Sequence, residues 1–300
     1  MGEGLVRSER RRLGPFDVGP LAYGCWRFTT SSVDEATLLI ETALEAGSNL
    51  IDNADVYGLD WGGSGFGACE ELLGRVLARS PSLRDRMVLA TKGGIVPPMP
   101  YNQSPAALRA ACDASLQRLG VDTIDLYQIH RPDLFAHPHD VAATLDALRT
   151  EGKIREVGVS NFTVPQYDTL AAVLPFPMAS TQPQYSAAHL EPLRDGTFDR
   201  AMRDGLVPLA WSPVAGGRLV SGDGIAPELL AVLDRLAERE GQDRATVALA
   251  FVLAHPSAPV AIIGSQNPAR VAAAGRALDV HLDRRDVYDI IESSEGVPLP

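Results

Sequence analysis

Short apolar runs alternate with longer amphipathic segments from about residue 18 onward. The apolar runs are rich in Val, Ile and Leu, and they predict strands at residues 20–24, 49–52, 87–92, 124–130, 154–160, 180–182, 206–211 and 260–264. The segments between them repeat apolar positions at the spacing of a helix. This alternation of strands and helices is typical of βα units that build a parallel sheet.

Local signals mark where the predicted helices begin and end. Ser32 and Glu35 have the spacing of a capping box, and Ser104 before Pro105 has the pattern of an N-cap followed by proline at the first helical position. Gly120 stands where a helix would stop, since glycine readily adopts the left-handed conformation that ends helices. These signals agree with the spacing of the apolar runs.

The repeated βα units leave two architectures open, a closed barrel and an open doubly wound sheet. A dinucleotide-binding sheet needs its first glycine in the tight turn after a strand. The segment 63–68 satisfies G-x-G-x-x-A, but it begins well beyond the strand end predicted at residue 52. We therefore predict an α/β protein, a single (β/α)8 TIM barrel domain over residues 1–300, with its active site at the C-terminal face of the strands. Residues 1–15, which include a basic stretch, are expected to form a flexible leader.

Charge and composition exclude several classes of partner. The chain carries 27 Lys and Arg against 38 Asp and Glu, a net charge of −11, which disfavours nucleic acid and anionic membranes. No apolar run approaches the ~18 residues of a membrane span, and the first residues lack the apolar segment of a signal peptide. The cysteines at 25, 69 and 112 have no metal-ligand spacing. We therefore expect a cytoplasmic protein with reduced thiols and no metal site.

Polar side chains stand where the predicted strands end, and active sites of barrels form at that face. Asp52, Lys92 and His130 end the second, third and fourth strands, and Tyr57 follows in the loop after Asp52. Taken singly, these residues could be a turn cap, a surface lysine or a packed histidine. An unpaired buried lysine or aspartate costs several kcal/mol, so the combination at one rim indicates a functional site.

Four segments resemble the motifs of the aldo-keto reductases: IDNADVYG at residues 51–58, TKGG at 91–94, QIHRPD at 128–133 and GVSNF at 158–162. They occur in the order of that family, and the resemblance extends from about residue 21 to residue 278. YGCWR at 23–27 and IIGS at 262–265 are most similar to a bacterial oxidoreductase branch whose members often have no assigned substrate. The resemblance implies a (β/α)8 barrel that binds NADPH without a separate dinucleotide-binding domain.

The resemblance also implies a catalytic tetrad of Asp52, Tyr57, Lys92 and His130. Reduction of a carbonyl by hydride needs a proton donor at the oxygen, and a phenol with a pKa of ~10 is protonated at neutral pH. Tyr57 would be this donor. Lys92 is expected to lower the pKa of Tyr57, and Asp52 to keep Lys92 charged and oriented. His130 would bind and orient the carbonyl oxygen.

NADP(H) is the expected cofactor, and the resemblance assigns residues to its parts. Ser160, Asn161 and Gln182 would hydrogen-bond the nicotinamide carboxamide. Ser265 and Arg270 match the positions that hold the 2'-phosphate, which favours NADPH over NADH because arginine binds phosphate with two parallel hydrogen bonds.

The loop after the seventh predicted strand would complete this cofactor site. Trp211 would stack on the nicotinamide ring, and the segment from Ser212 to Arg218 offers a hydroxyl, glycine backbone and a cation for the pyrophosphate. The residues expected to bind the cofactor are Gly24, Trp26, Asp52, Ser160, Asn161, Gln182, Trp211, Ser212, Pro213, Val214, Gly216, Gly217, Arg218, Gly264, Ser265, Gln266 and Arg270.

The substrate is expected to be a small-molecule carbonyl compound, and the residues expected to contact it are Trp26, Tyr57, Trp61 and His130. Phe28, Phe66 and the segment 97–101 are further candidates for the mouth. An aromatic mouth favours an aldehyde or ketone with an apolar body. No heptad pattern is sustained, and the predicted barrel exterior carries no sequence sign of an interface. A monomer is expected.

Three other functions are open at this point. The first is a regulatory or sensor barrel that binds NADPH with little turnover. The second is a barrel lyase in which Lys92 forms a Schiff base with its substrate, since a lysine at a strand end can act as a nucleophile. The third is a dehydrogenase with an open sheet that uses the glycine segment at residues 63–68.

Overall fold

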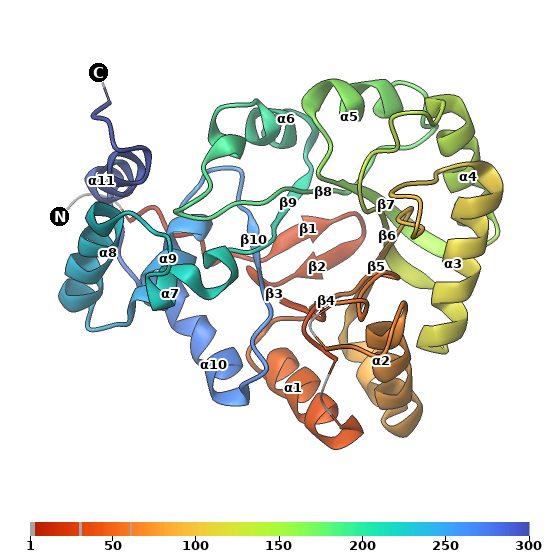
Figure 1. The fold of residues 1–300 in the computed structure, drawn as a ribbon, viewed down its shortest axis with the longest axis horizontal. Helices are drawn as coiled ribbons and strands as arrows, with labels where there is room; N and C mark the ends of the chain where they lie inside the picture. Colours follow the sequence, from red (N-terminus) through yellow and green to blue (C-terminus); the bar gives the residue numbers. More distant parts are fainter. Residues whose placement is uncertain (1–3, 30–31, 61, 300) are drawn as a thin grey trace.

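Parallel strands close into a barrel in the computed structural model, which describes residues 4–29, 32–60 and 62–299 (Figure 1). Around the barrel the order is β10-β3-β4-β5-β6-β7-β8-β9. Their bounds are β3 Leu21–Gly24, β4 Leu50–Asp52, β5 Val88–Gly93, β6 Ile124–Ile129, β7 Ile154–Ser160, β8 Ser180–Gln182, β9 Val207–Ala210 and β10 Val260–Ile263. Each predicted strand boundary lies within one residue of the observed one. The predicted (β/α)8 barrel is confirmed, and the open sheet is excluded.

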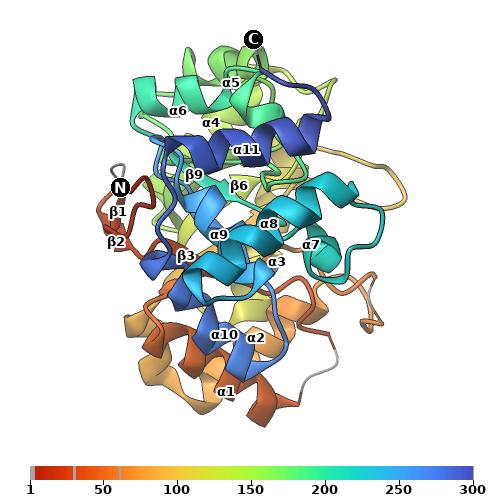
Figure 2. The same cartoon turned by 90° about the vertical axis from the view of Figure 1, so that its left-hand side faces the viewer.

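Helices surround the barrel on its outer face (Figure 1). Their bounds are α1 Val33–Glu45, α2 Ala68–Arg79, α3 Pro105–Leu119, α4 Pro138–Thr150, α5 Val164–Ala171, α6 Thr197–Asp204, α7 Arg218–Ser221, α8 Pro227–Glu240, α9 Arg244–Leu253, α10 Pro268–Ala273 and α11 Arg284–Glu295. Short 3₁₀ turns are η1 Pro81–Arg86, η2 Glu191–Leu193, η3 Ala215–Gly217 and η4 Ala274–Asp279. Helices α8 and α11 lie side by side (Figure 2), where Arg235 contacts Asp289 at 2.7 Å.

The helix ends follow the predicted signals. Ser32 and Glu35 form a reciprocal capping box at the start of α1. The Ser104 hydroxyl accepts a hydrogen bond from the backbone N–H of Ala107 at the start of α3, and Gly120 ends that helix with φ of +66°. A side chain at Gly120 would be strained, because L-residues rarely adopt this conformation.

A hairpin at the N-terminus closes the end of the barrel where the strands begin. It consists of β1 Arg11–Leu13 and β2 Phe16–Val18, and Leu13 and Val18 are fully buried. The side chain of Asn49, just before β4, donates to the carbonyl of Asp17 at 3.0 Å. The expectation of a flexible leader through residue 15 is therefore wrong at the hairpin, because alternate apolar side chains of this segment fill the barrel interior.

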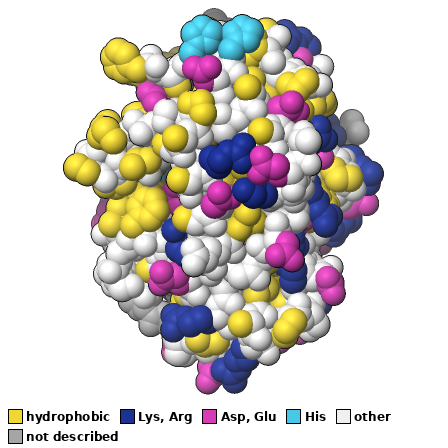
Figure 3. Space-filling model, turned by 90° about the vertical axis from the view of Figure 1, so that its right-hand side faces the viewer, with side chains coloured by type: hydrophobic (Ala, Val, Ile, Leu, Met, Phe, Trp, Pro, Cys, Tyr) yellow, Lys and Arg dark blue, Asp and Glu magenta, His cyan; other side chains and the backbone are white. Residues whose placement is uncertain are grey.

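The outer surface over α3 and α4 mixes acidic and basic side chains (Figure 3). Ion pairs join α3 to the segment that follows α4: Arg109 contacts Glu151 and Lys153 contacts Asp113, each at 2.7 Å. Such exposed pairs contribute little stability and keep the local charge balanced. Within the described residues, no helix has both the length and the apolar character needed to cross a bilayer.

Candidate active site

The strand ends bring the four predicted tetrad residues to one place. Asp52 is the last residue of β4, Lys92 lies near the end of β5, and His130 follows β6 directly. Tyr57 reaches the same region from the loop after β4. Parallel strands finish at the same end of the barrel, so residues far apart in the sequence converge there.

Lys92 is fully buried and its ammonium group has three hydrogen-bond acceptors. Nζ donates to Oδ2 of Asp52 at 2.7 Å, to the carbonyl of Asn53 at 2.8 Å and to the Tyr57 hydroxyl oxygen at 3.1 Å. Burial opposes the charge of Lys92, but the negative charge of Asp52 and the Tyr57 oxygen prevail and raise its pKa. A Schiff-base lysine needs an accessible neutral amine, so this environment disfavours the lyase hypothesis.

Tyr57 keeps its proton in this arrangement. Burial raises the pKa of Tyr57 to about 12, although the ammonium group of Lys92 acts in the opposite direction. Lys92 acts on this pKa in the expected direction, and burial outweighs its effect. The phenol oxygen accepts from Lys92, so the O–H hydrogen remains available for donation to another acceptor.

His130 packs its ring edge to face against Tyr57, with the ring centroids 5.7 Å apart. Burial lowers the pKa of His130 well below its ordinary value, and the charges of Lys92 and Arg131 add to this effect. Nδ1 of His130 is buried and has no hydrogen-bond partner among the described residues. The imidazole is therefore neutral, and it offers one N–H without adding a further positive charge beside Lys92.

Two amide side chains hold the second oxygen of the Asp52 carboxylate. Oδ1 accepts from Nε2 of Gln182 at 3.0 Å and from Nε2 of Gln128 at 3.3 Å. These bonds, together with Lys92, satisfy a carboxylate that is only 2% exposed. Oε1 of Gln182 accepts no hydrogen bond from the described part of the chain, so it is available to a ligand in the cavity.

A chain of hydrogen bonds joins the ends of β7, β8 and β9. The Trp211 indole donates to Oδ1 of Asn161 at 3.0 Å, and Nδ2 of Asn161 donates to the Ser160 hydroxyl at 2.9 Å. The Ser160 hydroxyl donates in turn to the Gln182 carbonyl at 3.0 Å. These contacts fix the wall of the site beside Asp52 before any ligand binds.

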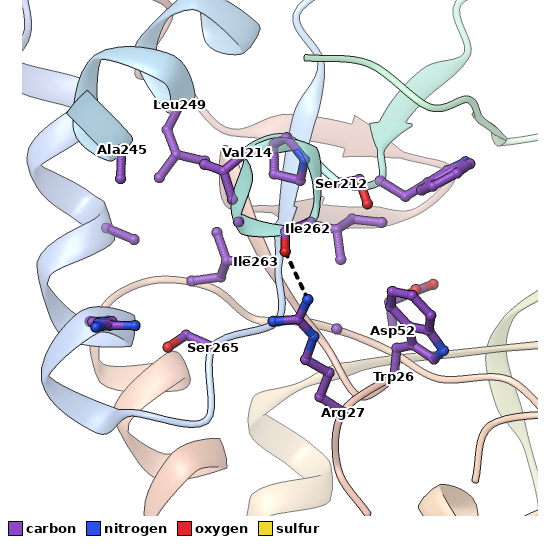
Figure 4. Close-up of a pocket in the computed structure, with 18 of the residues that line it drawn as sticks. Trp26, Arg27, Asp52, Ser212, Val214, Ala245, Leu249, Ile262, Ile263 and Ser265 are labelled. Atoms are coloured by element: carbon purple, nitrogen blue, oxygen red, sulfur yellow. Dashed lines mark hydrogen bonds between the residues drawn. The ribbon is translucent and has the colours of Figure 1, made fainter. Parts of the chain in front are cut away.

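One cavity of about 1340 Å³ opens from these strand ends (Figure 4). Among the residues predicted to form the site, those that line it are Gly24, Trp26, Asp52, Tyr57, His130, Ser160, Asn161, Gln182, Trp211, Ser212, Pro213, Val214, Gly216, Gly217, Gly264, Ser265 and Arg270. This volume is enough for a dinucleotide and a small substrate together.

A few predicted site residues do not line the cavity. Lys92 lies behind its wall, in contact with Asp52 and Tyr57. Nε of Arg218 donates to the Ala215 carbonyl at 3.2 Å, and Gln266 donates to the Tyr23 hydroxyl at 3.2 Å. Trp61, predicted to contact the substrate, lies outside the described residues.

The aromatic mouth expected from the sequence is only partly present. Trp26 lines the cavity, whereas Phe28 is fully buried against Tyr23, with ring centroids 6.3 Å apart. Phe66 lies outside the cavity lining and packs against the guanidinium of Arg118, 5.6 Å from the ring centroid. The segment 97–101 is also absent from the lining formed by the described residues. Charged side chains line part of the region that was expected to be aromatic.

Arg27 bridges two loops at the edge of the cavity. Its guanidinium donates to the Gly216 carbonyl at 2.9 Å, as Figure 4 shows. Gly216 adopts φ of +70° within η3, which brings this carbonyl toward Arg27. The bridge joins the loop after β3 to the loop after β9, two segments that the sequence separates widely.

The far arm of the cavity carries cations that the sequence analysis did not identify. Arg244 forms a two-fold hydrogen bond with Asp234, with both distances 2.6 Å. Arg276 also lines this arm, and the guanidinium of Arg270 makes no hydrogen bond or ion pair with the residues that the structure describes. Arg276 could have been predicted from the sequence, because it follows Arg270 by one short helical segment. Arg244 could not, because it reaches the cavity only through the packing of α9.

Comparisons with known proteins identify related chains. The sequence profile of the aldo/keto reductase family matches residues 20–295. A 6-dehydroglucose reductase from Novosphingobium aromaticivorans is 47% identical over 286 residues, which cover 94% of each chain. A glycerol dehydrogenase structure from Gluconobacter oxydans has a TM-score of 0.84 at 28% identity and covers 98% of both chains. An aldo/keto reductase from Klebsiella pneumoniae, solved in complex with NADP and acetate, has a TM-score of 0.79 at 25% identity over 98% of this chain and 97% of that one.

Proposed function

Because the chain belongs to the aldo/keto reductase family, we propose that it reduces an aldehyde or ketone to an alcohol with NADPH, and that Tyr57 is the proton donor. The observation that carries this proposal is the hydrogen-bonded group of Tyr57, Lys92 and Asp52 at the wall of the cavity. Oxidoreductases among the relatives agree with this class of reaction.

Side chains of the protein supply the proton that the reaction needs. When bound, NADPH supplies the hydride that the carbonyl carbon accepts. The carbonyl oxygen then takes on the negative charge of an alkoxide, which is about as basic as hydroxide and therefore a stronger base than a phenolate. Tyr57, with a pKa of about 12, donates its proton to this oxygen. The phenolate that forms lies 3.1 Å from the ammonium nitrogen of Lys92, which stabilises it.

His130 and Asp52 support this transfer in different ways. The neutral imidazole of His130, packed against the Tyr57 ring, can donate one N–H to the carbonyl oxygen and hold it beside the phenol. Asp52 balances the charge of Lys92 and fixes its position with a 2.7 Å contact. Neither residue needs to change its protonation state during the reaction.

The cavity offers suitable groups for each part of NADPH. Oε1 of Gln182 and the polar side chains of Ser160 and Asn161 would hold the nicotinamide carboxamide, and the Trp211 ring would stack on the nicotinamide. The backbone of the 212–217 loop would hold the pyrophosphate. Arg270, whose charge has no partner among the described residues, would bind the 2'-phosphate together with Ser265.

The relatives guide the choice of the first substrate. One is named for 6-dehydroglucose and another for glycerol, so their names refer to a sugar aldehyde and to a polyol. We extend the proposal to a sugar-derived aldehyde, with 6-dehydroglucose as the first compound to test. The alternative of a sensor barrel with little turnover predicts binding of NADPH without reduction of any such compound.

Fluorescence titration tests the cofactor first, because it needs no substrate. NADPH and NADH are added to the purified protein, and quenching of its three tryptophans, which include Trp211 in the cavity, is followed. NADPH is expected to bind more tightly than NADH, and oxidation of NADPH is then measured with 6-dehydroglucose. Absence of binding by either cofactor contradicts the proposal, and binding without turnover on a panel of carbonyl compounds favours the sensor barrel.

A further inference from the structure

Arg131 is a cation at the cavity whose charge no other described residue neutralises. It follows His130 directly, lines the cavity and is partly exposed. Its guanidinium makes no hydrogen bond or ion pair within residues 4–29, 32–60 and 62–299, whereas the guanidinium of Arg118 binds Glu70 at 2.7 Å. Its charge nevertheless contributes to the lowered pKa of His130, so it lies within electrostatic reach of the reacting group.

Asp60 supplies an acceptor at the same cavity. It lies in the loop after β4, three residues beyond Tyr57, and Oδ1 accepts a hydrogen bond from the Trp26 indole at 3.3 Å. Its other carboxylate oxygen makes no hydrogen bond in the part of the chain that the structure covers. The bond to Asp60 holds the Trp26 ring in place. Figure 4 shows this ring at the wall of the cavity.

We propose that Arg131 and Asp60 are specificity-determining residues, which select a neutral carbonyl compound carrying hydroxyl groups beside its reacting carbon. A hydroxyl both donates and accepts, so neighbouring hydroxyls can bond a carboxylate and a guanidinium at once. The C–H face of such a compound can pack on the Trp26 ring. This inference rests on the proposed reductase function and adds the residues that recognise the substrate.

The same pair of charges disfavours the other substrate classes. An anionic aldehyde would attract Arg131 but would be repelled by Asp60. An alkyl aldehyde would displace water from both charged groups without replacing its hydrogen bonds. Since a site that hydrogen-bonds a substrate hydroxyl discriminates strongly against the analogue without it, the hydroxylated compound is preferred.

Kinetics with two aldehydes of equal chain length test the inference. The wild-type protein and Arg131→Met are assayed with NADPH on glyceraldehyde, which carries two hydroxyls, and on propanal, which carries none. Methionine keeps part of the length of the arginine stem and removes the guanidinium. We expect kcat/KM for glyceraldehyde to fall about tenfold or more, mainly through KM, as for loss of a hydrogen bond to a charged group. The value for propanal should not fall, because Arg131→Met removes a charged group that propanal would have to desolvate.

Matched variants distinguish a loss of substrate recognition from a loss of structure. Arg131→Lys keeps the charge and should retain part of the preference for glyceraldehyde, and Asp60→Asn should reduce that preference while retaining an acceptor oxygen. Arg75→Met makes the same replacement on the exposed face of α2, away from the cavity, and should change neither substrate. The denaturation midpoint of Arg131→Met should equal that of the wild type, since Arg131 has no side-chain partner among the described residues.

Three results overturn the inference. Equal losses for glyceraldehyde and propanal in Arg131→Met would assign Arg131 a structural role. A wild-type preference for succinic semialdehyde that Arg131→Met abolishes would make the site a carboxylate site instead. If the wild type binds NADPH but reduces none of these aldehydes, nor 6-dehydroglucose, the proposed reductase function itself fails, and this inference fails with it.

Discussion

At the N-terminal end of the barrel, Leu13 and Val18 of the hairpin are fully buried among apolar side chains of the strands. At the C-terminal end, the strands finish in the buried Lys92–Asp52 ion pair beneath an open cavity. Strand β4 contributes to both ends, because Leu50 joins the apolar interior and Asp52 joins the ion pair. The two residues point to the same face of the strand, since side chains alternate with a period of two.

We expect the N-terminal end of the barrel to contribute mainly to stability and the C-terminal end mainly to catalysis. A buried ion pair costs desolvation and gives little net stability. Apolar burial at the other end, at about 25 cal/mol per Å², contributes directly to folding. We therefore expect substitutions of cavity side chains that leave the Lys92–Asp52 pair intact to change activity with little change in the free energy of unfolding, and substitutions at the hairpin to do the reverse.

Tyr57→Phe should give the largest effect, at the cavity. The variant keeps the ring but loses the proton donor, so kcat should fall by roughly 10²–10⁴-fold, the usual contribution of general acid catalysis. Fluorescence titration should show nearly unchanged NADPH affinity, and chemical denaturation a similar free energy of unfolding. Turnover close to that of the wild type would refute Tyr57 as the proton donor.

Leu13→Ala should give the next largest effect, at the opposite end. Removal of a fully buried leucine side chain should lower the free energy of unfolding by about 2–5 kcal/mol, measured by urea denaturation. Arg12→Ala, at an exposed position of the same strand, is the control and should change little. If kcat of the folded Leu13→Ala protein also fell strongly, the two ends would not be independent.

Arg270→Ala should have a selective effect within the cavity. Loss of a charged hydrogen bond to the 2'-phosphate should weaken NADPH binding about tenfold to a hundredfold and leave NADH binding nearly unchanged. Fluorescence titration with both cofactors measures this, and Arg285→Ala, outside the cavity, is the control. Equal losses for the two cofactors would place the 2'-phosphate contact elsewhere.

Changing the pH should have the smallest effect. The pKa of Tyr57 is raised to about 12, so this phenol stays protonated up to about pH 10. The pKa of His130 lies below its ordinary value of 6.5, so the imidazole stays neutral above that pH. With NADPH saturating, kcat should therefore show no inflection from either group between about pH 7 and 9. An inflection near pH 7.5 would contradict the environment described for these residues.

The alkaline absorbance titration isolates Tyr57 from the other tyrosines. The difference between the wild-type protein and Tyr57→Phe contains only the ionisation of Tyr57. It should begin above pH 10, because burial disfavours the phenolate more than Lys92 favours it. A difference that develops near pH 8 would show that Lys92 prevails over burial.

Much of the fold and part of the site followed from local pattern. The apolar runs predicted each strand of the barrel to within one residue, because the pattern of apolar residues along the chain directly reflects which positions of a strand are buried. The convergence of Asp52, Lys92 and His130 followed because they stand at strand ends that a parallel barrel must bring together, whereas their catalytic roles were inferred from the family resemblance. The hairpin was missed, since residues 11–18 are too short and too charged to signal burial by themselves.

Periodicity and strand-end residues along the chain were sufficient to predict the order of strands, the barrel and the residues where the strands end. Which of those groups are paired, which side chains line the cavity and which protonation states they favour depend on contacts that form only on folding. Arg131 and Asp60 face the same cavity as Tyr57, whereas Phe28 and Phe66 pack elsewhere. The reason is physical: periodicity is a property of neighbours along the chain, whereas burial and electrostatic interaction sum over residues that only folding brings together.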